Sequence, residues 1–513
     1  EFDAPINIIS TAFPAKVSAC SVPKDRFAEA ARLMKRAGAM LAAEWATDET
    51  NFGRGFGVHA CYRRGGQYLI VSAMLAADMP VFPSLTRRFV PAYRFERQMQ
   101  SLMGVMPEGH PDLRPWIKFE DWPPDAFPLR KSFDATTLMP RVPGEYIFAT
   151  AEGEGVYEIP VGPVHAGIIE PGHFRFQAMG EDIINLEERL GYVHKGIEKR
   201  FESLDWIDAV RLAARVSGDT TVAHSLAYCM ALESMTACTV PEYARWVRAI
   251  MLERERIANH LADIGAICND VAFSFMLYQT MRLKEIMLRT NQLIFGHRFM
   301  MDIVVPGGVV MGLDAQHKTM VLEELSMIEN EFERLVKIFD ENSSLDDRIR
   351  KTGILSFQQA CDLGVNGLVA RASGLSMDCR RDFPFPPYDQ FAVNVPVFNG
   401  GDVHARAWVR IEEVRESIRL IRAMIAALPK GQRSVICKSP AADITGFAVV
   451  EGWRGEIIYW LQSGPQGEIN RVMVRDPSSL CWIALERCVL GNIVPDFPLC
   501  NKSFNQSYSG NDL

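Results

Sequence analysis

The sequence lacks the features that mark a membrane-spanning or nucleic-acid-binding chain. No apolar run approaches the ~20 residues that a helix needs to cross a bilayer. The most apolar stretches, 300–311 and 418–428, are interrupted by Asp302 and Arg422. A basic surplus is also missing, because the net charge is −8, whereas nucleic-acid-binding proteins present a basic face. No signal-peptide pattern stands at the N-terminus. We therefore expect no nucleic-acid partner and no membrane span in this chain.

Cofactor-binding motifs are equally scarce. The 11 cysteines are scattered, and no two of them form a C-x-x-C pair, which is typical of reduced thiols buried as small apolar residues. This spacing gives no zinc or iron–sulfur signature. Neither G-x-G-x-x-G nor G-x-x-x-x-G-K-[ST] occurs. The sequence therefore predicts no cofactor on this chain and no direct nicotinamide or nucleotide site.

Patterning predicts an α+β chain of two parts, 1–135 and 136–513, joined by a linker near 129–144. The first part reads as a small α/β module, with a helix at 26–45, strands at 55–61 and 68–74 around a hairpin turn, and a helix at 93–103. The Pro-rich segment 122–128 precedes the linker, because proline breaks both helices and ladders.

The second part is predicted to be a large, mainly α-helical domain with flanking strands. Its strands are expected at 146–149, 155–161, 172–179, 448–461 and 471–475. Its helices are expected at 183–204, 207–238, 241–268, 275–300, 315–342 and 404–428.

Short sequence words in the first part carry a family resemblance. They are FER at 95–97, MGV at 103–105, GHPDLR at 109–114, DW at 121–122 and PLRK at 128–131. In this order they resemble the 30-kDa-type (C-type) subunit of respiratory complex I. The resemblance implies a docking module without chemistry of its own.

The second part resembles the 49-kDa-type (D-type) subunit of complex I and the large subunit of group 4 nickel–iron hydrogenases. The matching words are VGPVH at 161–165, EPGHFR at 170–175, YVHKGIEK at 192–199, ERERIANHL at 253–261, PGGV at 306–309, RASG at 371–374, GDV at 401–403, EGWRGE at 451–456 and DP at 476–477. A C-type part fused to a D-type part is similar to the large subunits of formate hydrogenlyase and hydrogenase-4.

The sequence departs from the hydrogenases at the metal ligands. That family holds nickel and iron with thiolates from two C-x-x-C pairs, which the resemblance places at Ser217 and Thr220 and at Ser478 and Cys481. Serine and threonine hydroxyls are neutral at pH 7 and bind soft metals poorly. We therefore expect no nickel–iron centre. The quinone contacts of complex I are not reproduced either, since the tyrosine position falls at Gly218 and the histidine position near Pro171.

Polar residues remain in or beside these words. They are Glu170, His173, Arg175, Asp219, Thr220, His224, Asp402, Arg406 and Asp476. Such a set, if buried, must be hydrogen-bonded or neutralised. One interpretation is a proton relay or coupling site with Glu170 and the histidines as carriers. The other, which the lack of a substrate motif favours, is a satisfied polar network that holds the fold. Arg256 and His260, four apart on one predicted helix, are interpreted as helix or subunit contacts.

Three hypotheses follow from the resemblance. In the first, the chain is a subunit of a complex I-like or hydrogenase-4-like redox and ion-translocating assembly and couples a partner to the membrane arm. The expected partners are a small iron–sulfur protein and antiporter-like membrane subunits, on the cytoplasmic side of the membrane. In the second, the chain reduces a quinone or another small acceptor in the cavity left by the metals. The third, an active nickel–iron hydrogenase, conflicts with the missing thiolates.

Overall fold

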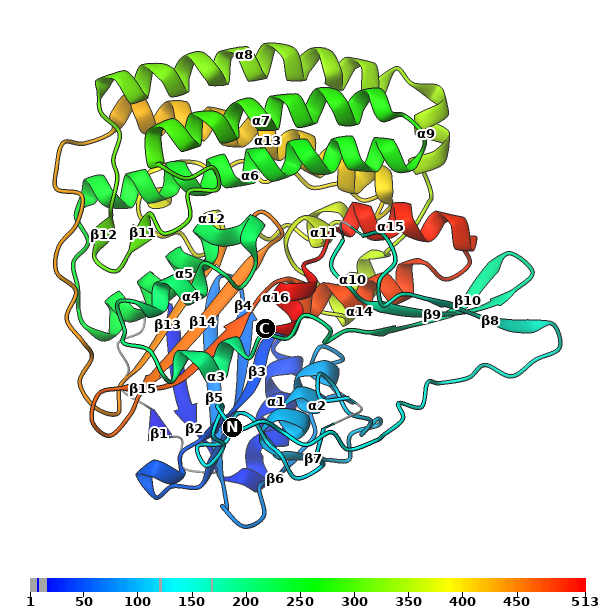
Figure 1. Cartoon of the computed structure of the whole chain (residues 1–513), viewed down its shortest axis with the longest axis vertical. Coiled ribbons are helices and arrows are strands. Elements are labelled where there is room, and N and C mark those ends of the chain that lie inside the picture. The colour runs from blue at the N-terminus through cyan, green and yellow to red at the C-terminus, as the bar shows by residue number, and fades with distance from the viewer. Residues whose placement is uncertain (1–6, 9–15, 120–121, 168) are drawn as a thin grey trace.

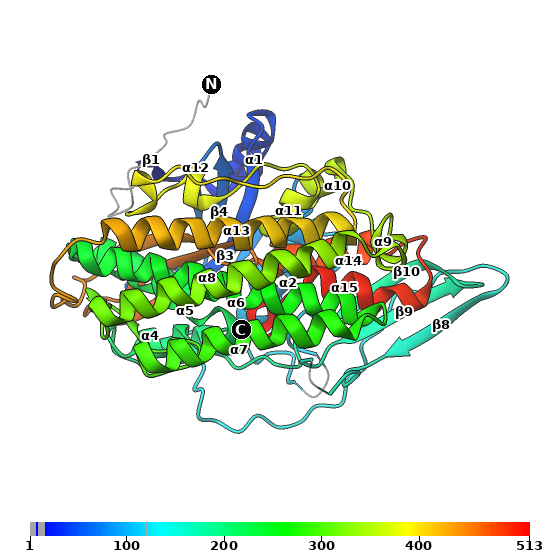
Figure 2. The same cartoon turned by 90° about the horizontal axis from the view of Figure 1, so that it is seen from above.

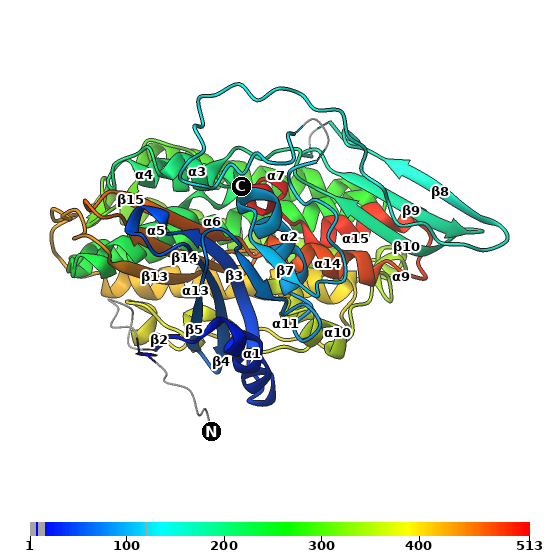
Figure 3. The same ribbon diagram turned by 90° about the horizontal axis from the view of Figure 1, so that it is seen from below.

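The N-terminal part of the chain forms a five-stranded sheet with two helices (Figures 1 and 3). The computed structural model describes residues 7–8, 16–119, 122–167 and 169–513. The strand order is β1-β2-β5-β4-β3, antiparallel except for the parallel β2–β5 pair. The elements are β1 (Asn7–Ile8), β2 (Val17–Ser21), α1 (Phe27–Arg36), β3 (Met40–Asp48), β4 (Phe56–Arg64), β5 (Gln67–Leu75), β6 (Val81–Pro83), α2 (Ala92–Met103) and β7 (Met106–Glu108).

A three-stranded antiparallel sheet projects from the side of the molecule (Figures 1 and 2). Its strands are β8 (Val156–Val161), β9 (His173–Met179) and β10 (Asp182–Arg189), in the order β10-β9-β8. One face of this sheet packs into the core, where Phe174 and Phe176 contact Phe497 and where Ile183 is buried as well.

Long helices cover the opposite side of the molecule (Figures 1 and 2). They are α6 (Glu242–Asp270), α7 (Ser274–Phe295), α8 (Ala315–Asp340) and α13 (Val403–Ala427). Beneath them lies α5 (Thr221–Met235), which is buried on almost every side, as expected of a helix that is apolar all round. No helix among the described residues is both long and apolar enough to cross a membrane.

A second three-stranded sheet lies between these helices and the N-terminal sheet (Figures 1 and 3). It consists of β13 (Thr445–Glu451), β14 (Glu456–Ser463) and β15 (Ile469–Arg475), with β14 in the centre. Trp45 of the N-terminal sheet packs against Trp460 of β14, with ring centroids 5.5 Å apart. The two parts of the chain therefore share a buried apolar interface.

Shorter elements connect these layers. They are α3 (Ile197–Phe201), α4 (Ala209–Ala213), β11 (Val304–Val305), β12 (Gly308–Val309), α9 (Ser343–Ile349), α10 (Phe357–Asp362), α11 (Gly367–Ala372), α12 (Cys379–Asp382), α14 (Ser478–Cys488), α15 (Phe497–Phe504) and α16 (Tyr508–Asp512).

The predicted α+β class is confirmed, and so are most of the long helices. The helix predicted at 26–45 is wrong beyond residue 36, because Gly38 takes φ +73 and ends it. The next residues form β3, whose nearly uniform burial removes the alternation typical of a strand.

Four other predicted elements differ from the structure. The segment 183–204 is not one helix, because its first half pairs with β9 as β10. The helix predicted at 207–238 is split into α4 and α5, with a 3-10 turn, Gly218–Thr220, between them. The strand predicted at 448–461 is a hairpin, with β13 and β14 joined through Gly452 and Gly455. Residues 146–149 form no strand.

Candidate functional site

Hydroxyl groups stand at three of the four positions that the family resemblance assigns to metal ligands, and Ser507 connects two of them. The Ser217 Oγ lies 2.9 Å from the Ser507 Oγ. The backbone N–H of Ser507 donates to the Ser478 Oγ at 2.9 Å. All three serines are buried. The segment before α5 and the start of α14 are thereby joined through direct hydrogen bonds between protein groups.

The third hydroxyl belongs to a charged cluster. The Thr220 Oγ1 donates to the Asp219 Oδ1 at 2.8 Å. The Arg454 guanidinium donates two hydrogen bonds to the Asp219 carboxylate, at 2.8 and 2.6 Å. Burial raises the pKa of the Asp219 carboxyl, but Arg454 more than offsets this and holds the pKa well below its usual range. Asp219 therefore stays ionised and paired.

His224 connects the two sides of the cluster. Its Nε2 lies 3.0 Å from the Asp476 Oδ2, and its Nδ1 lies 3.1 Å from the Tyr459 hydroxyl. Burial raises the pKa of Asp476, but His224, Arg454 and Ser478 together outweigh it and leave the pKa below the ordinary value. An ionised carboxylate only accepts hydrogen bonds, so the Nε2 of His224 donates to Asp476.

Cys481, at the fourth position, is an ordinary buried thiol. Its Sγ faces the carbonyl oxygen of Asn366 at 3.8 Å. Burial raises the pKa of this thiol to about 12, so the thiolate that a metal requires is disfavoured at neutral pH.

Segment 505–513 packs into the same region. A Cβ placed on Gly510 would lie 2.6 Å from the Asp476 carboxyl carbon, so only glycine fits there. Asp512 accepts a hydrogen bond from the backbone N–H of Val193 at 3.1 Å. This segment fills the space beside the former ligand positions.

The structure brings together only part of the predicted polar set. Asp219, Thr220, His224 and Asp476 share the cluster described above. Glu170 lies at the edge of this cluster, where its carboxylate accepts a hydrogen bond from the backbone N–H of Ser509 at 2.9 Å.

The other predicted residues lie outside the cluster. His173 and Arg175 stand on β9 in the projecting sheet, where Arg175 pairs with Glu158. Asp402 caps the first turn of α13, and Arg406 binds the carbonyl oxygens of Gly353 and Gly401. Each of these contacts is explained by the fold alone.

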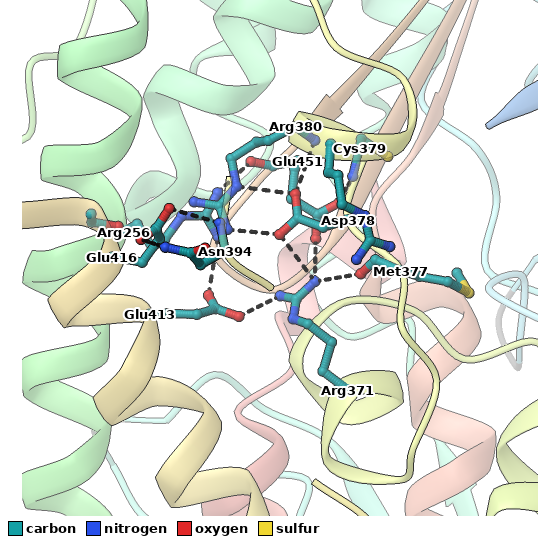
Figure 4. Close-up of polar contacts among 12 residues, drawn as sticks. Arg256, Arg371, Met377, Asp378, Cys379, Arg380, Asn394, Glu413, Glu416 and Glu451 are labelled. Atoms are coloured by element: carbon teal, nitrogen blue, oxygen red, sulfur yellow. Dashed lines mark hydrogen bonds and ion pairs between the residues drawn. The ribbon is translucent and has the colours of Figure 1, made fainter. Parts of the chain in front are cut away.

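A larger buried network, absent from the prediction, lies between α6, α13 and β13 (Figure 4). Arg371 contacts Glu413 at 2.6 Å, Glu451 at 2.9 Å and Asp378 at 3.6 Å. Arg380 pairs with Asp378 at 2.7 Å and with Glu253 at 3.0 Å. Their charged groups are almost completely withdrawn from solvent, so each carboxylate depends on its guanidinium partners.

Arg256 and His260 belong to this network. Arg256 reaches Glu413 at 3.3 Å, and the His260 Nε2 lies 2.8 Å from the same carboxylate. The interpretation of these two residues as a helix–helix contact is confirmed, because Glu413 lies on α13 and both residues lie on α6. The missed signal was that Glu253, Arg256, His260 and Asp263 recur at i, i+3, i+7 and i+10, so that α6 carries a row of ionisable residues among its buried apolar ones.

The donor set does not fit a nickel–iron centre. Three hydroxyls bound to protein groups and one neutral thiol replace the thiolates that bind nickel and bridge it to iron. Across residues 7–8, 16–119, 122–167 and 169–513, no group of three or more His, Cys, Asp or Glu side chains is arranged to hold a metal ion.

Comparison with known proteins defines the family. The family of the respiratory-chain NADH dehydrogenase 30 kDa subunit matches residues 20–138, and that of the 49 kDa subunit matches residues 270–445. Hydrogenase-4 component G of Escherichia coli (strain K12) is 31% identical over 451 residues, which cover 87% of this chain and 78% of the relative. Formate hydrogenlyase subunit 5 of the same organism is 32% identical over 452 residues, which cover 87% of this chain and 79% of the relative. The chain belongs to the fused 30 kDa/49 kDa subunit family that complex I shares with these hydrogenases.

A solved structure shows the same fold. A chain of the membrane-bound sulfane sulfur reductase, an archaeal respiratory membrane complex, superposes with a TM-score of 0.67 at 22% identity. The superposition covers 71% of this chain and 100% of that chain. At this identity the likeness concerns the fold alone.

Proposed function

We propose that this chain is a peripheral subunit of a membrane-associated, complex I-like or hydrogenase-4-like redox complex and works without a nickel–iron centre. Its role is to couple an iron–sulfur cluster on a partner subunit to the ion-translocating membrane arm, from the cytoplasmic side of the membrane. Membership of the fused 30 kDa/49 kDa family supports the assembly. It does not by itself carry over an activity.

The observation that carries the proposal is the set of hydrogen bonds among Ser217, Ser507 and Ser478. Binding a metal at these positions would break those bonds and leave buried polar groups unpaired, at about 1–3 kcal/mol each. The three serines therefore bind one another and link the two segments that the family resemblance assigns to metal ligands. Such a contact can transmit a displacement or a charge between the two segments. It provides no thiolate that could bind nickel for the reactions of hydrogen.

An exposed apolar stripe on α7 supports a protein partner. This stripe consists of Phe275, Tyr278 and Met281, which stand within seven residues at the start of the helix and are 44%, 71% and 43% exposed. The helix runs along the outside of the bundle (Figures 1 and 2). Clustered exposed apolar side chains mark interaction surfaces, so we assign this stripe to the iron–sulfur partner.

A reductase acting on a quinone or another small acceptor is the alternative. It requires an open site among the former ligand positions, and the close packing of Gly510 against Asp476 argues against one. A reductase activity lost in both Glu170→Gln and His173→Ala would favour this alternative over coupling.

Isolation of the native complex tests the proposal. The chain is tagged in its own genome and purified in mild detergent, and the accompanying chains are identified by mass spectrometry. Co-purification with an iron–sulfur subunit and membrane subunits is expected. Recovery of the chain alone, with neither class of partner, contradicts it.

A further inference from the structure

A cavity of about 310 Å³ separates the turn of the β4–β5 hairpin from the buried network. Its walls include Arg63, Asn366, Asp378, Cys379, Glu451 and Glu456. Arg64 and Gly65 of the hairpin turn line its rim and are exposed. The cavity therefore connects the interface between the two sheets with the surface.

Asn366 shows that this cavity is suited to polar occupants. Its side chain is 1% exposed, and neither its amide nitrogen nor its amide oxygen has a hydrogen-bond partner among the described residues. Buried amide groups normally bind protein or water. A space of this size accommodates several water molecules at about 30 Å³ each.

Glu451 lies where the buried network meets the cavity. Its Oε1 accepts a bond from Arg371 at 2.9 Å, and its Oε2 accepts the backbone N–H of Cys379 at 3.0 Å. The carboxyl group is 2% exposed. Arg371 thus contacts two carboxyl groups of the cavity wall, Glu451 and Asp378, and both belong to the network (Figure 4).

The charged groups around Glu451 fall into two sets, whose net charges are opposite when Glu451 is ionised. On one side stand the carboxyl groups of Glu253, Asp378, Glu413 and Glu451 against the guanidinium groups of Arg256, Arg371 and Arg380, so the acids exceed the bases by one. On the other side, Glu456 faces two guanidinium groups, Arg63 and Arg475, so the bases exceed the acids by one. The Tyr68 hydroxyl and the Cys379 thiol also face Glu456.

With Glu451 ionised the two sets cancel, and with Glu451 protonated they carry one net positive charge. Arg371 keeps its contacts with Asp378 and Glu413 in either state. Burial and the nearby Asp378 raise the pKa of Glu451, while Arg371 and Arg256 oppose the rise.

We propose that Glu451 is a proton-binding site of this chain, which exchanges its proton with water in the cavity between the β4–β5 hairpin and residues 366–383. The exchange converts the carboxylic acid into a carboxylate and a proton carried by water, with no change of oxidation state. This inference rests on the proposed function and deepens it, because it names a group that takes up charge between the helical bundle and the N-terminal sheet.

Infrared spectroscopy on the full-length chain tests the site. Difference spectra recorded as the pH is raised are expected to show loss of a protonated-carboxyl carbonyl band that shifts in D₂O. In Glu451→Gln, which fixes the neutral shape, the band should lose the component that belongs to Glu451 and keep that of Glu255, whose pKa burial raises to about 8. The whole band should persist in Glu233→Gln, a matched control in which another buried carboxylate, paired with Arg248, is neutralised.

A band of unchanged area and shape in Glu451→Gln overturns the proposal. If Glu451→Gln does not fold, Glu451→Asp keeps a titratable group at the same place, and the Glu451 component of the band must then move in frequency; a band identical to that of the wild type also overturns the site. The readout needs no membrane partner. A chain that shows the band but purifies without partners thus retains the proton site and loses the proposed function.

Discussion

The Nε2 atom of His224 lies 3.0 Å from the Oδ2 atom of Asp476, and both side chains are completely buried. His224 stands in the first turn of α5, and Asp476 lies two residues before α14. A histidine–carboxylate contact therefore links the two segments that the family resemblance assigns to metal ligands.

Replacing Asp476 by alanine should lower the free energy of unfolding by about 1–3 kcal/mol, because it leaves the buried His224 N–H without an acceptor. Denaturant titration measures the change. Asp208→Ala is the control, since its side chain is 60% exposed and its loss should cost less than about 0.5 kcal/mol. Equal effects of the two substitutions would refute a structural role for the pair.

Glu255 gives a prediction on pH. Burial raises the pKa of this carboxyl to about 8, although it accepts bonds from the backbone N–H groups of Val222 and Ala223. In the unfolded chain the pKa is about 4.3. The folded state thus holds the proton more tightly, and its contribution to stability is complete below about pH 4.3 and is lost as the pH rises toward 8.

Glu255→Gln should therefore flatten the fall in melting temperature between about pH 5 and 8. Thermal unfolding at several pH values measures it. The exposed Glu341→Gln should leave the wild-type slope unchanged. Parallel curves for wild type and Glu255→Gln would show that the carboxyl is ionised in the fold.

Arg94 ties the N-terminal module to the rest of the chain. It contacts Glu188 of β10 at 3.0 Å and Glu486 of α14 at 2.9 Å, and its own side chain is 5% exposed. Arg94→Met should cost about 3–5 kcal/mol, since it leaves buried carboxylates unpaired. Arg289→Met removes a surface pair with Glu285 and should cost at most about 0.5 kcal/mol; chemical denaturation compares the two.

The α7 stripe predicts where the iron–sulfur partner binds. The double substitution Tyr278→Lys and Met281→Lys, at two exposed positions, should reduce recovery of the partner in affinity purification without lowering the melting temperature. Phe357→Lys, on α10 and 56% exposed in the native chain, is the control and should leave recovery unchanged. Normal recovery with the double variant would place the partner elsewhere.

The long helices were predictable because their apolar positions recur with a helical period over many turns. The N-terminal strand β3 was not, because burial on both faces removes the alternation that distinguishes a strand from a helix. The segment of β10 was misread for a related reason: its partner β9 determines its conformation, and pairing is not visible in a local pattern.

Some residues of the candidate site could likewise be predicted from the sequence, and others could not. Ser217, Thr220 and His224 were found because they stand close together in one sequence word. Ser507 and Arg454 were missed as site residues because their contacts join segments more than 230 residues apart. The network around Arg371 was missed because its charges come from separate helices and strands, and only the folded chain reveals which carboxylate balances which guanidinium.

Nickel content is the most direct test of the central claim. The native complex is purified, and its nickel and iron are determined by inductively coupled plasma mass spectrometry against the concentration of this chain, with a nickel-containing hydrogenase prepared in parallel. We predict iron from the partner subunit and nickel far below one atom per chain. Near-stoichiometric nickel that disappears in Ser217→Ala would contradict the account.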